Sequence, residues 1–224
     1  VLYRNHVQSA VLQVKLTHAG IPFVIHSGVK FFEQAHIKDI TAFLKVLYNP
    51  LDEISWMRLL RLIPGIGNNT AFRIFSVFQD QQAIRLTKDN DSLQRLIPKK
   101  AINSWIVLQE CFQKMLEEKI SPSNMIGIIY KDFYRDVLFS SFENAMQRET
   151  DISYLEEFAV NYDKLETFLN ELSLVGSSIL TDLESEQHDN QETLTLTTIH
   201  QAKGLEWDAV IVIGLTEGLF PHQR

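Results

Sequence analysis

Cysteine, long apolar runs and a secretion signal are scarce or missing in this sequence. The single cysteine, Cys111, excludes an internal disulfide and has no second cysteine with which to bind a metal. No apolar run approaches the roughly 20 residues that span a bilayer, and the first residues lack the basic and apolar blocks of a signal peptide. We therefore expect an intracellular, cytoplasmic protein without a membrane partner.

Several signatures of catalysis are also missing. The sequence has no G-x-x-x-x-G-K-[ST], no G-x-S-x-G and no H-E-x-x-H, so it lacks the phosphate loop that nucleotide hydrolysis needs. Its 7 histidines are scattered without the spacing of a metal site, and we expect no metal ligands in this chain. Three of these histidines, His36, His188 and His222, are expected at the surface.

The net charge of −7 argues against a nonspecific binder of nucleic acids. Affinity for phosphates depends on clustered lysine and arginine. Any contact with nucleic acid must therefore be local.

The residues that are present form two kinds of pattern. Strand patterns occur only near the two ends, in "VLYRN" and "IPFVIHSG" and again in "LTLTTIH" and "DAVIVIGL", and a helix pattern separates the first two. Strand, helix and strand with short joints indicate a parallel α/β layer. The alternation in "LTLTTIH" suits a half-covered strand, and the continuous apolar run in "DAVIVIGL" suits a strand buried on both faces.

After the second strand pattern, a helix is expected from the three-and-four spacing of Ile37, Ile40, Phe43, Leu44 and Leu47, and it should end at Asn49-Pro50. From about residue 51 to 180, the pattern is helical almost throughout. We predict an α/β fold whose parallel sheet is built from both chain ends and interrupted by a large all-helical insertion, so that the chain is mostly helical. The predicted sheet domain comprises residues 1–50 and 190–224, and the predicted insertion comprises residues 51–189, with a start near residue 100 as the alternative. Helix starts are expected at "IPKK" and at "SPS".

Four polar or flexible residues follow the third strand pattern: His200, Lys203, Gly204 and Glu206. Ligands of open α/β sheets bind at the carboxyl ends of strands. Lysine offers a charge for a phosphate, glycine permits close approach of the backbone, and glutamate accepts hydrogen bonds from a sugar. The alternative is an ordinary polar loop.

Tyr3 and Arg4 lie at the end of the first strand pattern. A tyrosine ring can stack on a nucleobase, and an arginine can bind phosphate oxygens with its planar fork. The alternative is a core tyrosine followed by a surface arginine.

The segment "LIPGIGNNT" places Gly65 and Gly67 on either side of Ile66, between two helix patterns. Such a hairpin exposes backbone N–H groups that can bind a phosphate of duplex DNA, with Thr70 expected to cap the next helix. The alternative is a tight turn between helices that needs glycine for its left-handed backbone.

Together, these segments resemble the UvrD/Rep/PcrA-type superfamily 1 DNA helicases. The stretch "LTLTTIHQAKGLEWDAVIVIGLTEGLFPH" is similar to the fifth motif region of that family, residues 1–50 to its fourth motif and the sequel, and "LIPGIGNNT" to its glycine hairpin. The blocks keep the family's order, and the helical stretch occupies the place of its inserted subdomain. The resemblance implies a RecA-like second motor domain that closes on ATP with a first one and moves along single-stranded DNA in the 3′ to 5′ direction.

The resemblance also implies roles for the residues that match its motifs. Tyr3 would stack on the adenine, Arg4 would act in catalysis at the γ-phosphate, and Glu206 would bind the ribose, with Gly204 beside the nucleotide. His200 and Lys203 would link the nucleotide to the DNA strand. The duplex backbone would be touched by the hairpin residues Gly65, Ile66, Gly67 and Thr70.

The phosphate loop and the Mg²⁺-holding motif of the family lie outside this chain, so the resemblance implies that ATP with Mg²⁺ serves the intact protein and that this fragment alone is inactive. The implied partners are single-stranded DNA, the duplex junction and the N-terminal motor domain of the same parent chain. The implied setting is DNA repair or replication at the nucleoid, in bacterial cytoplasm. Two alternatives stay open: a helicase-derived module that docks on DNA or protein, and the helicase arm of a helicase-nuclease.

Overall fold

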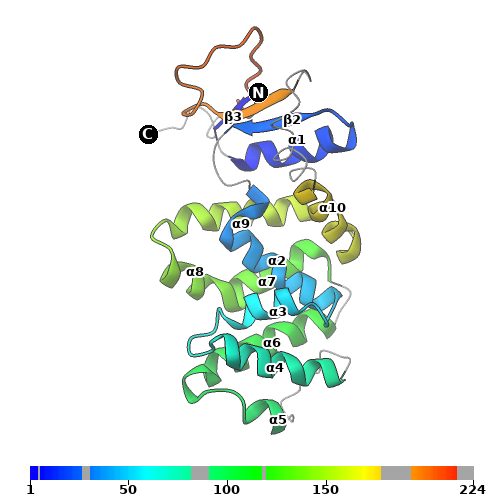
Figure 1. Cartoon of the computed structure of the whole chain (residues 1–224), viewed down its shortest axis with the longest axis vertical. Helices are drawn as coiled ribbons and strands as arrows, with labels where there is room; N and C mark the ends of the chain where they lie inside the picture. The colour runs from blue at the N-terminus through cyan, green and yellow to red at the C-terminus, as the bar shows by residue number, and fades with distance from the viewer. Residues whose placement is uncertain (5, 27–30, 82–90, 118–119, 178–192, 216–224) are drawn as a thin grey trace. The chain divides into compact units, whose positions relative to one another are not determined.

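The computed structural model describes residues 1–4, 6–26, 31–81, 91–117, 120–177 and 193–215. By internal contacts the chain divides into two units, which we call the sheet unit (Val1–Gln34 with Asn170–Arg224) and the helical unit (Ala35–Leu169). The elements in chain order, drawn in Figure 1, are β1 (Leu2–Tyr3), α1 (His6–His18), β2 (Phe23–His26), η1 (Phe31–Glu33), α2 (Ala35–Tyr48), α3 (Glu53–Leu60), α4 (Asn68–Gln81), α5 (Asp91–Gln94), η2 (Lys99–Ala101), α6 (Ile102–Glu117), α7 (Pro122–Ile129), η3 (Tyr130–Tyr134), α8 (Arg135–Ser141), α9 (Ala145–Ala159), α10 (Leu165–Ser177) and β3 (Leu194–Thr198). Within the described residues, no helix combines the length and the apolar character needed to span a membrane.

The sheet unit contains a small parallel sheet built from both ends of the chain, as predicted. Its strand order is β1-β3-β2, and both pairings are parallel. β3 therefore lies between two strands that precede it by most of the chain, and α1 packs beside the sheet (Figure 1). The apolar core of this unit is formed by Tyr3, Leu16, Phe23 and Leu196.

The run "DAVIVIGL" differs from its prediction as a strand buried on both faces. It joins the sheet by one parallel bridge, between Val212 and Leu2, on the side of β1 away from β3. Val210 and Ile211 are 51% and 59% exposed, and only Ile213 packs against the core. The prediction was wrong because a continuous apolar run shows only that a segment is suited to burial. No described element of the sheet unit covers this one.

The alternation in "LTLTTIH" is also not reproduced. Thr197 is buried like Leu196, and Thr195 is half-buried like Leu194, although the pattern predicted that Thr195 and Thr197 would face solvent. β3 is the middle strand of the sheet, and neighbours on both sides enclose its carboxyl half.

The helical unit begins with α2, whose predicted apolar stripe is confirmed. Ile37, Ile40, Phe43 and Leu44 are fully buried, and this face packs on α3, α7 and α9. By its contacts α2 therefore groups with the helices that follow, whereas the sequence pattern had placed residues 35–50 with the sheet. Periodicity identified the helix but carries no information about which layer it packs against.

Two helix starts expected from the sequence are present. Ser121 is the N-cap of α7, and its Oγ accepts a hydrogen bond from the N–H of Asn124 at 3.3 Å, with Pro122 in the first turn. Pro98 precedes η2, which continues into α6. Both cases follow the preference of proline for the first turn of a helix.

His36 is fully buried, so its predicted surface position was wrong. Its Nδ1 accepts a hydrogen bond from Arg148 Nη1 at 2.7 Å, because a guanidinium can only donate. Its Nε2 lies 3.2 Å from Asp151 Oδ2, without the geometry of a hydrogen bond. These polar neighbours make burial of the ring tolerable and join α2 to α9. His188 and His222 lie outside the described residues.

A second buried polar cluster lies one turn further along α2. Asp39 accepts hydrogen bonds from Arg58 Nε at 2.7 Å and from the Tyr134 hydroxyl at 2.5 Å. Burial, followed by the Asp39 charge, raises the pKa of the Tyr134 phenol above its usual value. The carboxylate therefore holds α2, α3 and η3 together, since removing either donor would leave it buried with one partner fewer.

Candidate functional site

The parallel register brings the two predicted nucleotide segments to one edge of the sheet. Tyr3 pairs with Thr198, and the Tyr3 carbonyl accepts a hydrogen bond from the N–H of Ile199 at 2.9 Å. Arg4 therefore lies one residue and His200 two residues beyond the paired positions, although most of the chain separates them in sequence. Parallel strands place their carboxyl ends at the same edge, which is where ligands of open α/β sheets bind.

The loop that follows β3 is a folded turn rather than an extended linker. The Thr198 carbonyl accepts hydrogen bonds from the N–H groups of Gln201 at 3.1 Å and Ala202 at 3.0 Å, and the Thr198 hydroxyl donates to Gln201 Oε1 at 2.9 Å. Gly204 has a φ of 87°, a left-handed conformation that favours glycine. The turn leaves the side chains of His200, Lys203 and Glu206 exposed.

Tyr3 is fully buried in the core of the sheet unit. Burial raises the pKa of its phenol, and a hydrogen bond with Ser9 acts in the opposite direction. Stacking of this ring on an adenine stays a prediction, but in this structure the ring is part of the core, so a base would reach it only after the ring had left that position. The alternative was a core tyrosine followed by a surface arginine; the tyrosine is in the core, and Arg4 is half-buried.

Gln8 organises the start of α1, and the sequence analysis did not identify it. Its Oε1 accepts a hydrogen bond from the backbone N–H of Arg4 at 2.9 Å. Its amide also occupies the space beside Gly214, where an added Cβ would lie 2.5 Å from Gln8 Nε2. The available signal was the spacing of four residues between Arg4 and Gln8 at the start of a helix, where backbone N–H groups need side-chain acceptors.

The glycine hairpin lies in the helical unit, between α3 and α4. Ile63 and Ile66 are buried and anchor it, whereas Gly65 and Gly67 are exposed. Gly65 has a φ of 92°, and a Cβ at Gly67 would meet no atom within 4 Å. The hairpin therefore presents backbone rather than side chains at its surface.

Thr70 does not cap α4 as predicted. The helix begins at Asn68, and the carbonyl of Gly67 accepts the hydrogen bond of Ala71 N–H at 2.9 Å, so Gly67 occupies the capping position and Thr70 lies inside the first turn. The prediction was wrong because Gly also serves as an N-cap, and a threonine close by is not decisive. Contact of Thr70 with DNA stays a prediction.

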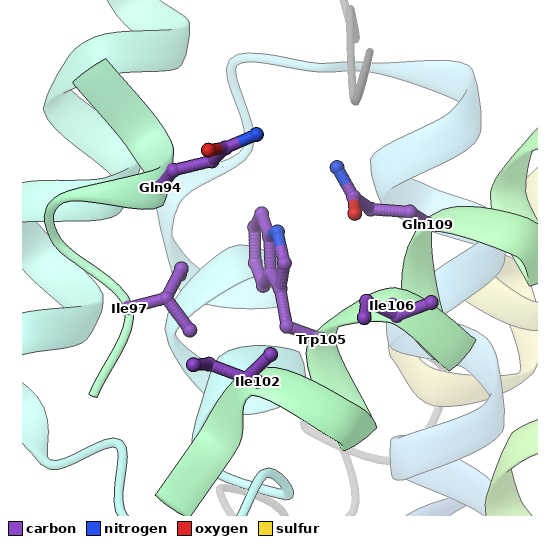
Figure 2. Close-up of a pocket in the computed structure, with 6 residues that line it drawn as sticks. All are labelled: Gln94, Ile97, Ile102, Trp105, Ile106 and Gln109. Carbon is purple, nitrogen blue, oxygen red and sulfur yellow. The ribbon is translucent and has the colours of Figure 1, made fainter. Parts of the chain in front are cut away.

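A cavity of about 440 Å³ lies in the helical unit beside the start of α6 (Figure 2). The ring of Trp105 stands in it, with the amides of Gln94 and Gln109 on either side of the ring. The remaining described lining residues are Ile97, Ile102 and Ile106. None of the described residues lining it is charged, so this cavity does not suit a triphosphate, which is bound by cationic side chains and by backbone N–H groups.

A resident metal has no evident site in the described part of the chain, where no group of three or more His, Cys, Asp or Glu side chains comes together. Cys111 is buried, and its burial, with a smaller effect of the Asp132 charge, raises the pKa of its thiol to about 12. A thiol of this kind is protonated at neutral pH and unreactive.

The parallel sheet built from both chain ends, the polar residues at its carboxyl edge and the long helical stretch between the two ends define an α/β protein with a helical insertion. Comparison with protein families then places it: the model of the UvrD-like helicase C-terminal domain matches residues 1–224, and the chain belongs to this family. The predicted family resemblance is confirmed.

Three relatives illustrate the similarity. The chain is 29% identical over 245 residues to the ATP-dependent DNA helicase PcrA of Bacillus subtilis. It is 32% identical over 238 residues to PcrA of Staphylococcus epidermidis, and 28% identical over 237 residues to PcrA of Staphylococcus aureus. Each comparison covers 100% of this chain and 32% of the relative, so the chain spans about a third of the length of the curated relatives it matches.

Proposed function

We propose that these 224 residues act as the C-terminal portion of an ATP-dependent 3′ to 5′ DNA helicase that serves DNA repair or replication. In this proposal the sheet unit is a RecA-like second motor domain, and the helical unit is the inserted subdomain that approaches the duplex. The observation that carries the proposal is the register of β1 with β3, because it gathers Arg4, His200 and the loop to Glu206 at one carboxyl edge. Family membership supports the same function.

The residues at this edge fit part of an ATP site. Arg4 supplies a guanidinium for the γ-phosphate, Glu206 a carboxylate for the ribose hydroxyls, and Gly204 a backbone that a ligand can approach closely. When ATP is bound, Mg²⁺ would neutralise negative charge on its phosphates, and the ligands for that ion would come from the N-terminal motor domain. The role of Arg4 is to stabilise negative charge that develops on the phosphoryl group.

The coupling to DNA is proposed for the exposed side chains of the same loop. His200 and Lys203 lie on the turn that begins at Thr198, so a change at the nucleotide edge is transmitted to them through a short, hydrogen-bonded segment. Lys203 offers a charge for a phosphate of single-stranded DNA. In the helical unit, the exposed backbone of Gly65 and Gly67 is proposed to contact the duplex.

The sharpest test is Arg4→Ala in the longer protein that contains these residues. We expect kcat for DNA-stimulated ATP hydrolysis to fall by about 10³-fold while KM changes little, because an arginine of this kind acts on the transition state. Lys15→Ala, which removes an exposed cation from α1, is the matched control and should leave kcat unchanged. An unaltered kcat in Arg4→Ala would remove this residue from the proposed role.

A second test concerns the chain alone. The 224 residues contain no phosphate loop, so we expect no ATP hydrolysis above background, with or without single-stranded DNA. Mixing with the N-terminal motor domain should restore hydrolysis if the two halves form one site. Turnover by the chain alone at the rate of an intact helicase would overturn the proposal that it is half of a motor.

A further inference from the structure

Two stretches of the helical unit carry basic residues and no acidic ones, although the whole chain has a net charge of −7. Neither residues 54–79 nor residues 92–109 contain an aspartate or a glutamate. The basic residues in them are Arg58, Arg61, Arg73, Arg95, Lys99 and Lys100. Arg58 binds Asp39, and the other five are exposed. These two stretches are therefore positive, although the chain as a whole is negative.

The two stretches touch at the glycine hairpin. A Cβ added to Gly65 would lie 3.4 Å from the Cβ of Lys100, so η2 packs directly beside the hairpin backbone. Ile97, which precedes η2, and Ala101, its last residue, are buried, and the N–H of Ala101 donates to the carbonyl of Pro98 at 2.8 Å. These buried residues hold η2 in place, while the side chains of Lys99 and Lys100 are exposed.

The two lysines are not engaged elsewhere in the described part of the chain, where no ion pair includes either of them. A lysine ammonium binds phosphate as a point charge, so each of these two lysines can contact a phosphate of the DNA backbone. Exposed glycine N–H groups alone make a short contact. A lysine pair beside them lengthens that contact along the DNA backbone.

We infer that Lys99 and Lys100 form the second half of a duplex-binding surface whose first half is the Gly65–Gly67 hairpin, and that this surface binds the phosphate backbone of double-stranded DNA without reading its sequence. The inference rests on the proposed function, because it names further residues for the contact between the helical unit and the duplex. No base-reading group is required, since lysine and backbone N–H contacts to phosphates carry no sequence information.

The test is the salt dependence of duplex binding. For the 224-residue chain and a blunt duplex, we expect the double variant Lys99→Ala/Lys100→Ala to bind about 10-fold more weakly at 0.1 M salt and to reduce the slope of log K against log salt by about 1.8, which corresponds to two lost phosphate contacts. The loss should be the same for duplexes of unrelated sequence. Lys99→Arg/Lys100→Arg should keep the wild-type slope.

The matched control is Lys45→Ala/Lys131→Ala, which removes two exposed lysines from α2 and η3 of the same unit. It changes the net charge by the same amount and should leave the slope unchanged. An equal loss in both double variants would reduce the effect to overall charge and overturn the inference. So would an unchanged slope in Lys99→Ala/Lys100→Ala.

The failure of this inference can be told apart from failure of the proposed function. If Gly67→Ala weakens duplex binding and the lysine variant does not, the hairpin contacts the duplex but Lys99 and Lys100 do not. If the wild-type chain does not bind the duplex at any salt concentration, both the proposed duplex contact of the helical unit and the inference are contradicted. Circular dichroism of each variant excludes loss of fold as the cause.

Discussion

The side chain of Gln8 occupies the space that any side chain at Gly214 would need. A Cβ built on Gly214 would lie 2.5 Å from Gln8 Nε2 and 2.8 Å from its Cδ, and the other end of the same amide accepts the N–H of Arg4. One glutamine thus contacts the segment after β1 and the segment after Val212, which flank the proposed nucleotide edge. A side chain at residue 214 would displace the Gln8 amide from this position.

Gly214→Ala should destabilise the chain more than Gly20→Ala does. Both glycines have a left-handed backbone, with φ of 74° and 64°, so each substitution carries strain of about 1 kcal/mol. At Gly20 no atom lies within 4 Å of the new Cβ, whereas at Gly214 the Gln8 amide must move and its hydrogen bond with Arg4 is lost. That bond adds about 1 kcal/mol, measurable by urea unfolding.

The interaction between Gln8 and Gly214 can be measured separately with the variant Gln8→Ala. In the double variant Gln8→Ala/Gly214→Ala the clash is absent, so the two single effects should sum to more than the effect of the double variant. Strict additivity would show that Gln8 and Gly214 do not interact and would contradict the proposed link.

The hairpin glycines should separate stability from DNA binding. Gly65 has a φ of 92° and lies against Lys100, so Gly65→Ala should cost about 1–3 kcal/mol of folding stability. Gly67 has open space around it and no left-handed strain, but it caps α4, so Gly67→Ala should cost less stability than Gly65→Ala, about 0.5–1 kcal/mol. It should still weaken duplex binding, because its methyl group lies on the exposed backbone. Wild-type duplex affinity in Gly67→Ala would remove this residue from the contact.

The sequence predicted those features of the fold that depend on residues close together in the chain. The α2 stripe and the helix start at Ser121-Pro122 depend on residues close together in the sequence, and both are found as expected. The exposure of Ile211 and the burial of His36 depend instead on which segments pack against them. His36 is buried because Arg148 and Asp151, far away in sequence, supply its polar neighbours.

The candidate site was predictable as a set of residues but not as an arrangement. The polar loop after β3 and the pair Tyr3-Arg4 could be identified from residue type, and the structure brings them to one edge because β1 and β3 are parallel neighbours. The burial of Tyr3 could not be predicted, because a tyrosine at a strand end suits a core as well as a ligand. Ser9 makes a hydrogen bond with Tyr3, and the Gln13 amide donates to Ser9 Oγ. Both residues lie on the buried face of α1, where helical periodicity predicts apolar residues.

The hydroxyl of Tyr134 should contribute measurably to the stability of the helical unit. Tyr134→Phe removes a buried donor at 2.5 Å from Asp39 and leaves the carboxylate with Arg58, so we expect a loss of about 1–3 kcal/mol in urea unfolding. Tyr48→Phe is the control, since Tyr48 makes its hydrogen bond with Glu166 at the exposed surface and its removal should leave the midpoint nearly unchanged. Equal effects of the two variants would show that burial of the Asp39 cluster does not matter.

The buried thiol of Cys111 should make the chain less stable in alkali. Burial, with the Asp132 charge adding to it, raises the thiol pKa to about 12, whereas the thiol of an unfolded chain ionises near 9. The folded state therefore holds the proton more tightly, so this contribution to stability is complete below about pH 9 and is lost as the pH rises toward 12. Other groups also ionise in this range, among them the phenol of Tyr134 in the unfolded chain, so the informative quantity is a difference between variants. Urea unfolding of the wild type and of Cys111→Ala should show that the free energy of unfolding falls by ~2 kcal/mol more in the wild type between about pH 8 and about pH 10.5.

Equal falls in the two proteins would mean that the thiol ionises in the folded chain as readily as in the unfolded one. That result would contradict the effect expected from the burial of Cys111 in α6.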